Sequence, residues 1–216
     1  MKIIITGSTG MIGEGILLSC LDDPTITQIL SVSRKPCEIK HPKLTEYLVS
    51  DFLEIDLNDP MLKGYDACFF CAGISSVGVD PETYKRITYD TTLHFASALQ
   101  PKEPMTFIYV SGGGTDSSEK GKMAWARVKG KTENDLMKLG FRQSFGFRIG
   151  IVQPTHPQKQ VLPYYKYMNW MIPILKVIAP NMVNTMDQVA RAMVKLAQTT
   201  YPNSVIHVKD IHQLAK

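Results

Sequence analysis

Short apolar runs alternate with longer amphipathic segments along most of the chain. Short runs of apolar, β-branched or aromatic residues are typical of strands, whereas apolar positions three and four residues apart indicate a helix. These patterns predict strands at residues 2–6, 27–32, 44–49, 67–71, 105–110 and 144–149. They predict helices at residues 11–21, 81–99 and 122–139. The strand at 67–71 has no polar alternation, which is typical of a parallel strand covered on both faces.

The order of these elements predicts an α/β fold. We expect a Rossmann-type, doubly wound parallel sheet in a three-layer α/β/α arrangement. Residues 1–216 are predicted to form a single domain, in which residues 150–184 make a small substrate or lid region. Beyond it, the pattern predicts a helix at 187–199 and a closing strand at 204–208.

The segment at 161–180 is rich in aromatic and apolar residues but also holds two prolines and two lysines, namely Pro163, Pro173, Lys166 and Lys176. These residues interrupt the apolar length that a transmembrane helix requires. A short C-terminal helical lid over a ligand pocket, or a packed pair of short helices, is the expected structure. A membrane-surface helix or a partner-binding patch is the alternative.

Composition excludes a wholly disordered chain, a collagen-like repeat and a disulfide scaffold. Hydrophobic residues make up 44% and charged residues 20% of the 216 residues, as in an ordinary soluble globular protein. The net charge of +4 is spread along the chain, so it does not indicate nucleic-acid binding. Cys68 and Cys71 lie three apart on a predicted strand and therefore point to opposite faces, so we predict no metal site there. We expect reduced thiols and a cytoplasmic location, because the first apolar run is too short for a signal peptide.

A glycine-rich turn follows the first strand and opens the first helix, in the order Thr6-Gly7-Ser8-Thr9-Gly10-Met11-Ile12-Gly13. Glycine allows a sharp strand-to-helix bend and a close approach of the backbone to a phosphate. The amides at the start of the helix then face the anion, and the helix dipole favours its charge. This turn therefore predicts a dinucleotide-binding site.

The end of the second strand carries Ser33, Arg34 and Lys35, about twenty residues after the glycines, where the ribose 2′ substituent is recognised. A carboxylate there would accept a hydrogen bond from a 2′-hydroxyl and would repel a 2′-phosphate. This chain has two cations and no acid at that point, which favours NADP(H) over NAD(H). The guanidinium of Arg34 can both stack on adenine and bind phosphate.

The TGxxGxxG pattern resembles the extended and atypical short-chain dehydrogenase/reductases (SDRs), the NAD-dependent epimerase/dehydratase-like superfamily. Among the branches of this superfamily, the chain most resembles the Tat-interacting-protein-like branch of atypical SDRs, and secondarily the NmrA-type cofactor sensors. The resemblance implies that Asp51 meets the adenine amino group, that Phe52 packs on the ring, and that a backbone segment at 149–151 holds the nicotinamide. The cofactor-binding set it implies is Gly7, Ser8, Thr9, Gly10, Met11, Ile12, Gly13, Arg34, Lys35, Asp51, Phe52, Cys71, Ala72, Gly73, Lys129, Ile149, Gly150 and Ile151.

The resemblance also implies a catalytic serine, and a tyrosine followed four residues later by a lysine. Ser111 and Lys129 match the serine and the lysine, but Trp125 stands where the tyrosine belongs. An indole only donates a hydrogen bond and does not titrate, so it cannot be the general acid. We expect Lys129 to bind ribose and Trp125 to form a pocket wall. Other candidate proton donors are Tyr84, Tyr89, His156, Tyr164, Tyr165 and Tyr167.

Three functions remain open. The first is an NADPH-dependent oxidoreductase with a non-standard active site and an unknown small-molecule substrate. The second is a non-catalytic, NADPH-sensing regulatory or partner-binding protein, and the third is an epimerase/dehydratase-like enzyme. We expect a monomer or a homodimer.

Overall fold

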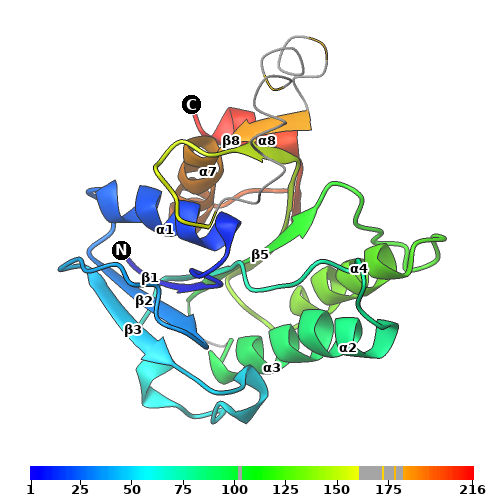
Figure 1. Ribbon diagram of the computed structural model, residues 1–216, viewed down its shortest axis with the longest axis horizontal. Coiled ribbons are helices and arrows are strands. Elements are labelled where there is room, and N and C mark those ends of the chain that lie inside the picture. The colour runs from blue at the N-terminus through cyan, green and yellow to red at the C-terminus, as the bar shows by residue number, and fades with distance from the viewer. Residues whose placement is uncertain (102–103, 161–171, 173–177, 179–181) are drawn as a thin grey trace.

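Seven parallel strands form one sheet, in the order β3-β2-β1-β4-β5-β6-β9 (Figure 1). The computed structural model describes residues 1–101, 104–160, 172, 178 and 182–216. The strands are β1 (Lys2–Thr6), β2 (Gln28–Ser33), β3 (Leu44–Leu48), β4 (Ala67–Phe70), β5 (Thr106–Gly112), β6 (Gln143–Ile149) and β9 (Val205–Ile206). The strand order reverses between β1 and β4, and ligands of doubly wound sheets bind at such a point.

Helices cover both faces of this sheet (Figure 1). Helices α1 (Met11–Asp22), α7 (Met186–Gln198) and α8 (Val208–Leu214) lie on one face, and α2 (Pro81–Lys85), α3 (Thr91–Ala98) and α4 (Ala124–Leu136) lie on the other. Two short 3₁₀ turns, η1 (Phe52–Glu54) and η2 (Pro60–Leu62), follow β3. The Rossmann-type α/β fold expected from the sequence is confirmed.

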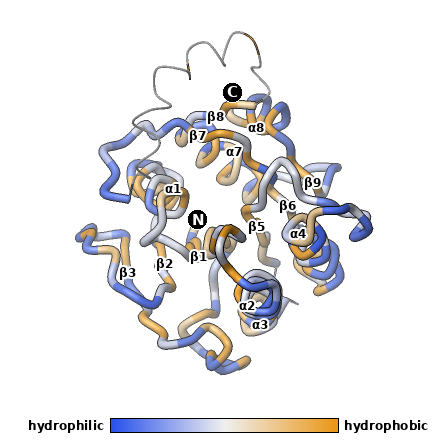
Figure 2. Tube along the Cα trace, turned by 45° about the vertical axis from the view of Figure 1, so that its right-hand side comes forward, coloured by the Kyte–Doolittle hydropathy of each residue, from blue (hydrophilic) through white to orange (hydrophobic). Residues whose placement is uncertain are grey.

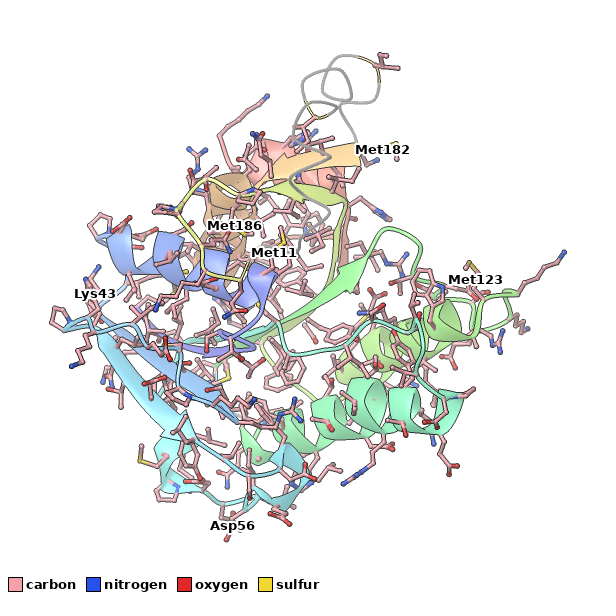
Figure 3. All side chains as sticks on the ribbon, viewed as in Figure 1. Met11, Lys43, Asp56, Met123, Met182 and Met186 are labelled. Carbon is pink, nitrogen blue, oxygen red and sulfur yellow. The ribbon has the colours of Figure 1, made fainter. Side chains whose placement is uncertain are left out.

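Alternation along the strands explains the three layers. Ile3 and Ile5 are fully buried against α1 and α7, whereas Ile4 between them is buried against α3 and α4. Figure 2 shows hydrophilic residues along much of α4, whose outer side faces solvent. Gly15 of α1 lets α7 approach closely, because a Cβ there would lie 2.6 Å from Cγ of Met186, labelled in Figure 3.

The predicted strands of the sheet agree with the observed strands within two residues at each end. Only Val205–Ile206 pairs where residues 204–208 were predicted, and α8 follows at once without having been predicted. The helix predicted at 81–99 is interrupted by a π-helical turn, η3 (Arg86–Asp90). The helix predicted at 122–139 is shorter, Ala124–Leu136.

The predicted lid region contains two short strands that the pattern did not indicate. Strands β7 (Ile151–Gln153) and β8 (Val183–Thr185) pair in parallel as a separate two-stranded sheet. The helical lid predicted at 161–180 lies almost entirely outside the described residues. None of the helices in the described part of the chain is long and apolar enough to span a membrane.

Candidate functional site

At two of its three glycine positions, the glycine-rich turn has no room for a side chain. Gly7 has φ +70°, and a Cβ there would lie 2.7 Å from the carbonyl of Cys71. A Cβ on Gly13 would lie 2.1 Å from the carbonyl oxygen of Gly7. Both glycines are therefore required by backbone packing alone.

Gly10 is different, because its missing side chain leaves open space. A Cβ there would meet only the Gly7 carbonyl oxygen, at 3.5 Å. Gly10 is also the N-cap of α1. Because glycine has no side chain, the amides of the first turn have no side-chain acceptor from the N-cap residue. Such uncapped amides are an anion-binding group. Backbone packing therefore does not require glycine at this position.

Strand β1 is tied to β4 at this point. The hydroxyl oxygen of Thr6 accepts hydrogen bonds from the backbone amides of Cys71 and Ala72, each at 3.1 Å. The buried hydroxyl of Ser8 is 2.7 Å from that of Ser31 on β2. These bonds bring the carboxyl ends of three strands to one crevice.

A cavity of about 860 Å³ occupies the crevice, within the usual range for ligand pockets. Ten of the predicted cofactor-binding residues line it: Gly7, Ser8, Thr9, Gly10, Arg34, Lys35, Phe52, Cys71, Ala72 and Gly73. The structure does not place the other predicted residues in its wall: Met11, Ile12, Gly13, Asp51, Lys129, Ile149, Gly150 and Ile151. Sequence reasoning missed seven wall residues: Glu14, Ser33, Pro36, Cys37, Glu38, Lys159 and Gln160.

The cations at the end of β2 are exposed and unpaired. Within the described part of the chain, the side chains of Arg34 and Lys35 form no hydrogen bond or ion pair. The carboxylate of Glu38, in the same cavity wall, is instead 3.1 Å from Nζ of Lys159. This wall therefore has free positive charge for an anion.

Asp51 is engaged elsewhere. Its Oδ1 accepts a hydrogen bond from the amide of Leu53 at 3.0 Å and so caps η1. Its Oδ2 is 2.9 Å from the guanidinium of Arg86. Of the predicted adenine-binding pair, the structure brings only Phe52 to the cavity, where its ring is 6% exposed.

Ser111 belongs to a buried polar network. Its hydroxyl donates to Oε1 of Glu133 at 2.6 Å, and the Glu133 carboxylate is fully buried. Nη2 of Arg148 is 2.5 Å from Oε2 of Glu133 and also donates to Ser117. A Cβ on Gly146 would lie 2.5 Å from Cδ of Glu133, so the strand below has no room for a side chain. The proton of Ser111 is thus directed at Glu133 rather than at the site.

Lys129 lies one helical turn before Glu133. Its Nζ is 5.5 Å from the ring centroid of Tyr109 and, among the described residues, has no hydrogen-bond or ion-pair partner. Burial lowers the pKa of Lys129 to about 8, and the nearby Glu133 carboxylate opposes that shift. Lys129 is therefore a half-buried ammonium with all three of its donors free.

Trp125 packs on the loop between β5 and α4. A Cβ on Gly114 would lie 2.8 Å from Cη2 of the indole, so the ring lies against Gly114. Among the other candidate proton donors, Tyr84 is buried and burial raises its pKa, and Tyr89 donates to Asp135 at 2.8 Å. Nε2 of His156 is 3.1 Å from Asp187. Tyr164, Tyr165 and Tyr167 lie outside the described residues.

Comparison with known proteins places this geometry in a family. Residues 3–123, which include the glycine turn, β2 and β4, match the model of the NAD dependent epimerase/dehydratase family. The chain belongs to this family. This family binds a nicotinamide dinucleotide, and the matched residues include the glycine turn that lines the cavity.

Curated relatives are distant but cover most of the chain. It is 23% identical to "Protein fmp52, mitochondrial" of Aspergillus fumigatus, over 76% of this chain and 73% of that one. It is 25% identical to the protein of that name from Debaryomyces hansenii, over 79% and 75% of the two chains. The expected cytoplasmic location is therefore wrong, because these names point to mitochondria instead.

Solved structures of epimerases share the fold. UDP-N-acetylglucosamine 4-epimerase of Methanobrevibacter ruminantium M1 has a TM-score of 0.69 at 19% identity, covering 94% of this chain and 74% of that one. UDP-glucuronic acid 4-epimerase of Bacillus cereus, solved with NAD, has a TM-score of 0.67 at 16% identity, covering 99% and 81%. At these identities the likeness concerns the Rossmann fold alone.

Proposed function

We propose that the chain binds NADP(H) in the 860 Å³ cavity and acts as an NADPH-dependent oxidoreductase with a non-standard active site. The observation that carries this proposal is the cavity wall itself. Gly10 leaves space at the start of α1, while Arg34 and Lys35 add two cations, unpaired within the described residues, where NAD-specific sites have a carboxylate.

The proposal assigns a group to each part of the dinucleotide, and the groups for its nicotinamide end, Lys129 and residues 149–151, lie outside the cavity wall. The amides of the glycine turn would hold the pyrophosphate, Phe52 the adenine, and Arg34 with Lys35 the 2′-phosphate. The free ammonium of Lys129 would hold the nicotinamide ribose, and the backbone of residues 149–151 the nicotinamide. When bound, the dinucleotide supplies or accepts the hydride. Ser111 can only accept a hydrogen bond from a substrate, because its own proton is directed at Glu133.

Within the family, we place the chain nearest to the Tat-interacting-protein-like branch of atypical SDRs. We propose that its substrate is a small molecule.

A non-catalytic NADPH sensor is the second candidate. Trp125 at the tyrosine position and the engagement of Ser111 by Glu133 both favour it, since neither side chain can then donate a proton to a substrate. Steady-state oxidation of NADPH with a panel of quinones, flavins and carbonyl compounds separates the two. Turnover with any of them supports the oxidoreductase. Tight NADPH binding without turnover across the panel contradicts it and supports the sensor.

Arg34→Ala is expected to weaken NADPH binding about tenfold more than NADH binding, because only NADPH loses a charge-assisted contact to its 2′-phosphate. Isothermal titration with each nucleotide measures both constants. Arg191→Ala removes one exposed positive charge from α7 and serves as the matched control. Equal weakening of NADPH and NADH by Arg34→Ala would show that this residue does not recognise the 2′-phosphate.

The pKa of Lys129 gives a second expected result. Because its pKa in the folded protein is about 8, the ammonium is charged at pH 7 and largely neutral at pH 9.5. NADPH affinity should fall about three- to tenfold between pH 7 and pH 9.5, where the 2′-phosphate keeps its charge while the charged contact of Lys129 becomes a neutral one. In Lys129→Met the affinity is lower at pH 7 and the pH dependence is lost. Fluorescence titrations at several pH values measure this, and identical profiles for the two proteins would remove Lys129 from the site.

A further inference from the structure

We call residues 157–160 the strap. Two of them, Lys159 and Gln160, line one side of the cavity although they lie more than a hundred residues away from the glycine turn. The carboxylate of Glu14, in the first turn of α1, accepts the backbone amides of Lys159 at 3.0 Å and Gln160 at 2.8 Å. The side-chain amide of Gln158 donates to the carbonyl oxygen of Met11 at 2.5 Å. Glu14 is only 5% exposed, so its two oxygens fix the strap to α1.

This anchoring determines where the side chain of Lys159 can reach. Its Nζ is 3.1 Å from Oε2 of Glu38, on the loop that follows β2. That loop also carries Arg34 and Lys35, and all four side chains belong to residues that line the same cavity. The wall thus holds three cations and two carboxylates, and one of these carboxylates, that of Glu14, is occupied by the amides of the strap.

The Lys159–Glu38 pair is a weak one that an anion can replace. The two side chains are 62% and 70% exposed, and exposed ion pairs contribute little net stability. A phosphate monoester carries between one and a half and two negative charges at pH 7, which is more than the single charge of Glu38. A cation held on an anchored backbone should therefore prefer the phosphate.

We propose that Lys159 is the third cation of the 2′-phosphate site, that Glu38 is its counter-ion in the absence of ligand, and that Glu14 positions it by holding the strap. This inference rests on the proposed NADP(H) binding. It makes selectivity for NADPH depend on the strap as well as on the end of β2. Removing Lys159 should weaken NADPH binding, and neutralising Glu38 should strengthen it.

The experiment is a titration of the full chain and of two variants with NADPH, NADH, 2′-AMP and 5′-AMP. We expect Lys159→Met to weaken binding of NADPH and 2′-AMP about fivefold while NADH and 5′-AMP bind as before. We expect Glu38→Gln to strengthen binding of NADPH and 2′-AMP about twofold to fivefold. Lys63→Met and Glu82→Gln change the same charges on exposed residues outside the cavity wall and are the matched controls.

The unaltered chain and the variants test different statements. If the unaltered chain binds NADPH and NADH equally, the proposed NADP(H) preference is wrong and the role of Lys159 is wrong with it. If the unaltered chain prefers NADPH but Lys159→Met weakens all four nucleotides alike, or none, only the assignment of Lys159 is overturned. The same holds if Glu38→Gln changes binding no more than Glu82→Gln does.

Discussion

Gly10→Asp is expected to weaken dinucleotide binding at least about 100-fold, equal to about 2.7 kcal/mol, without unfolding the protein. The fold tolerates a side chain at this position, because the nearest atom to a Cβ is 3.5 Å away. Aspartate is also one of the best N-cap residues, and Gly10 has the extended backbone that an N-cap adopts. Its carboxylate, however, would lie where the account places the pyrophosphate. Isothermal titration measures the binding loss, and a circular-dichroism melt measures the stability.

Two controls make this result specific. Asn203→Asp adds the same charge on an exposed residue outside the cavity wall. It should leave binding unchanged. Gly13→Ala should instead lower the melting temperature, because its Cβ would collide with the Gly7 carbonyl oxygen. If Gly10→Asp binds NADPH as the unaltered chain does, the phosphates do not lie at the start of α1.

Glu133→Ala is expected to destabilise the fold by about 3–5 kcal/mol, because it leaves the guanidinium of Arg148 buried without its counter-ion. For a chain of this size, each kcal/mol shifts the melting temperature by about 2–4 °C, so a loss of roughly 6–20 °C is expected. Ser111→Ala removes one hydrogen bond of the same network and should cost about 1–2 kcal/mol. Urea unfolding and thermal melts measure both variants.

The double variant Glu133→Met with Arg148→Met is the control for this network. It removes both charges together and replaces them with apolar side chains, so it should be more stable than Glu133→Ala. A Glu133→Ala protein that melts within 2 °C of the unaltered chain would contradict the buried-pair assignment. It would mean that Arg148 finds another partner or reaches water.

The glycine turn and the basic end of β2 could be predicted because their signals are local. A strand, three spaced glycines and a helix occupy the first 22 residues, and each needs only its sequence neighbours to be recognised. The sequence does not distinguish the roles of the three glycines, however. Gly7 and Gly13 are required by contacts with the backbone after β4 and β1, whereas packing leaves room for a side chain at Gly10.

The residues that sequence reasoning missed depend on contacts between distant segments. Glu14 follows the glycines directly, but the two residues whose amides donate hydrogen bonds to it, Lys159 and Gln160, are about 145 residues further along the chain. Likewise, nothing near Asp51 in the sequence indicates that Arg86 occupies its carboxylate. A charged side chain carries no mark of its partner until the fold brings the two together.

The predictions of helix boundaries were wrong for a different reason. Apolar periodicity runs unbroken through residues 81–99, but the π-helical turn at Arg86–Asp90 shifts the phase of the helix without a glycine or proline to signal it. Helix α8 begins at a capping box in which the carboxylate of Asp210 accepts a hydrogen bond from the amide of His207. The helix has only seven residues, too few to show a clear apolar periodicity. Short elements are fixed by caps and packing more than by pattern.

The most direct test of the account is a side-by-side calorimetric titration of the purified chain with NADPH and NADH. We predict that both bind and that NADPH binds at least tenfold more tightly, a difference of about 1.4 kcal/mol. Equal affinities would contradict the role given to Arg34 and Lys35. If neither nucleotide binds, the central claim is contradicted, because the open space at Gly10 and the cations of the cavity wall would then not serve a dinucleotide.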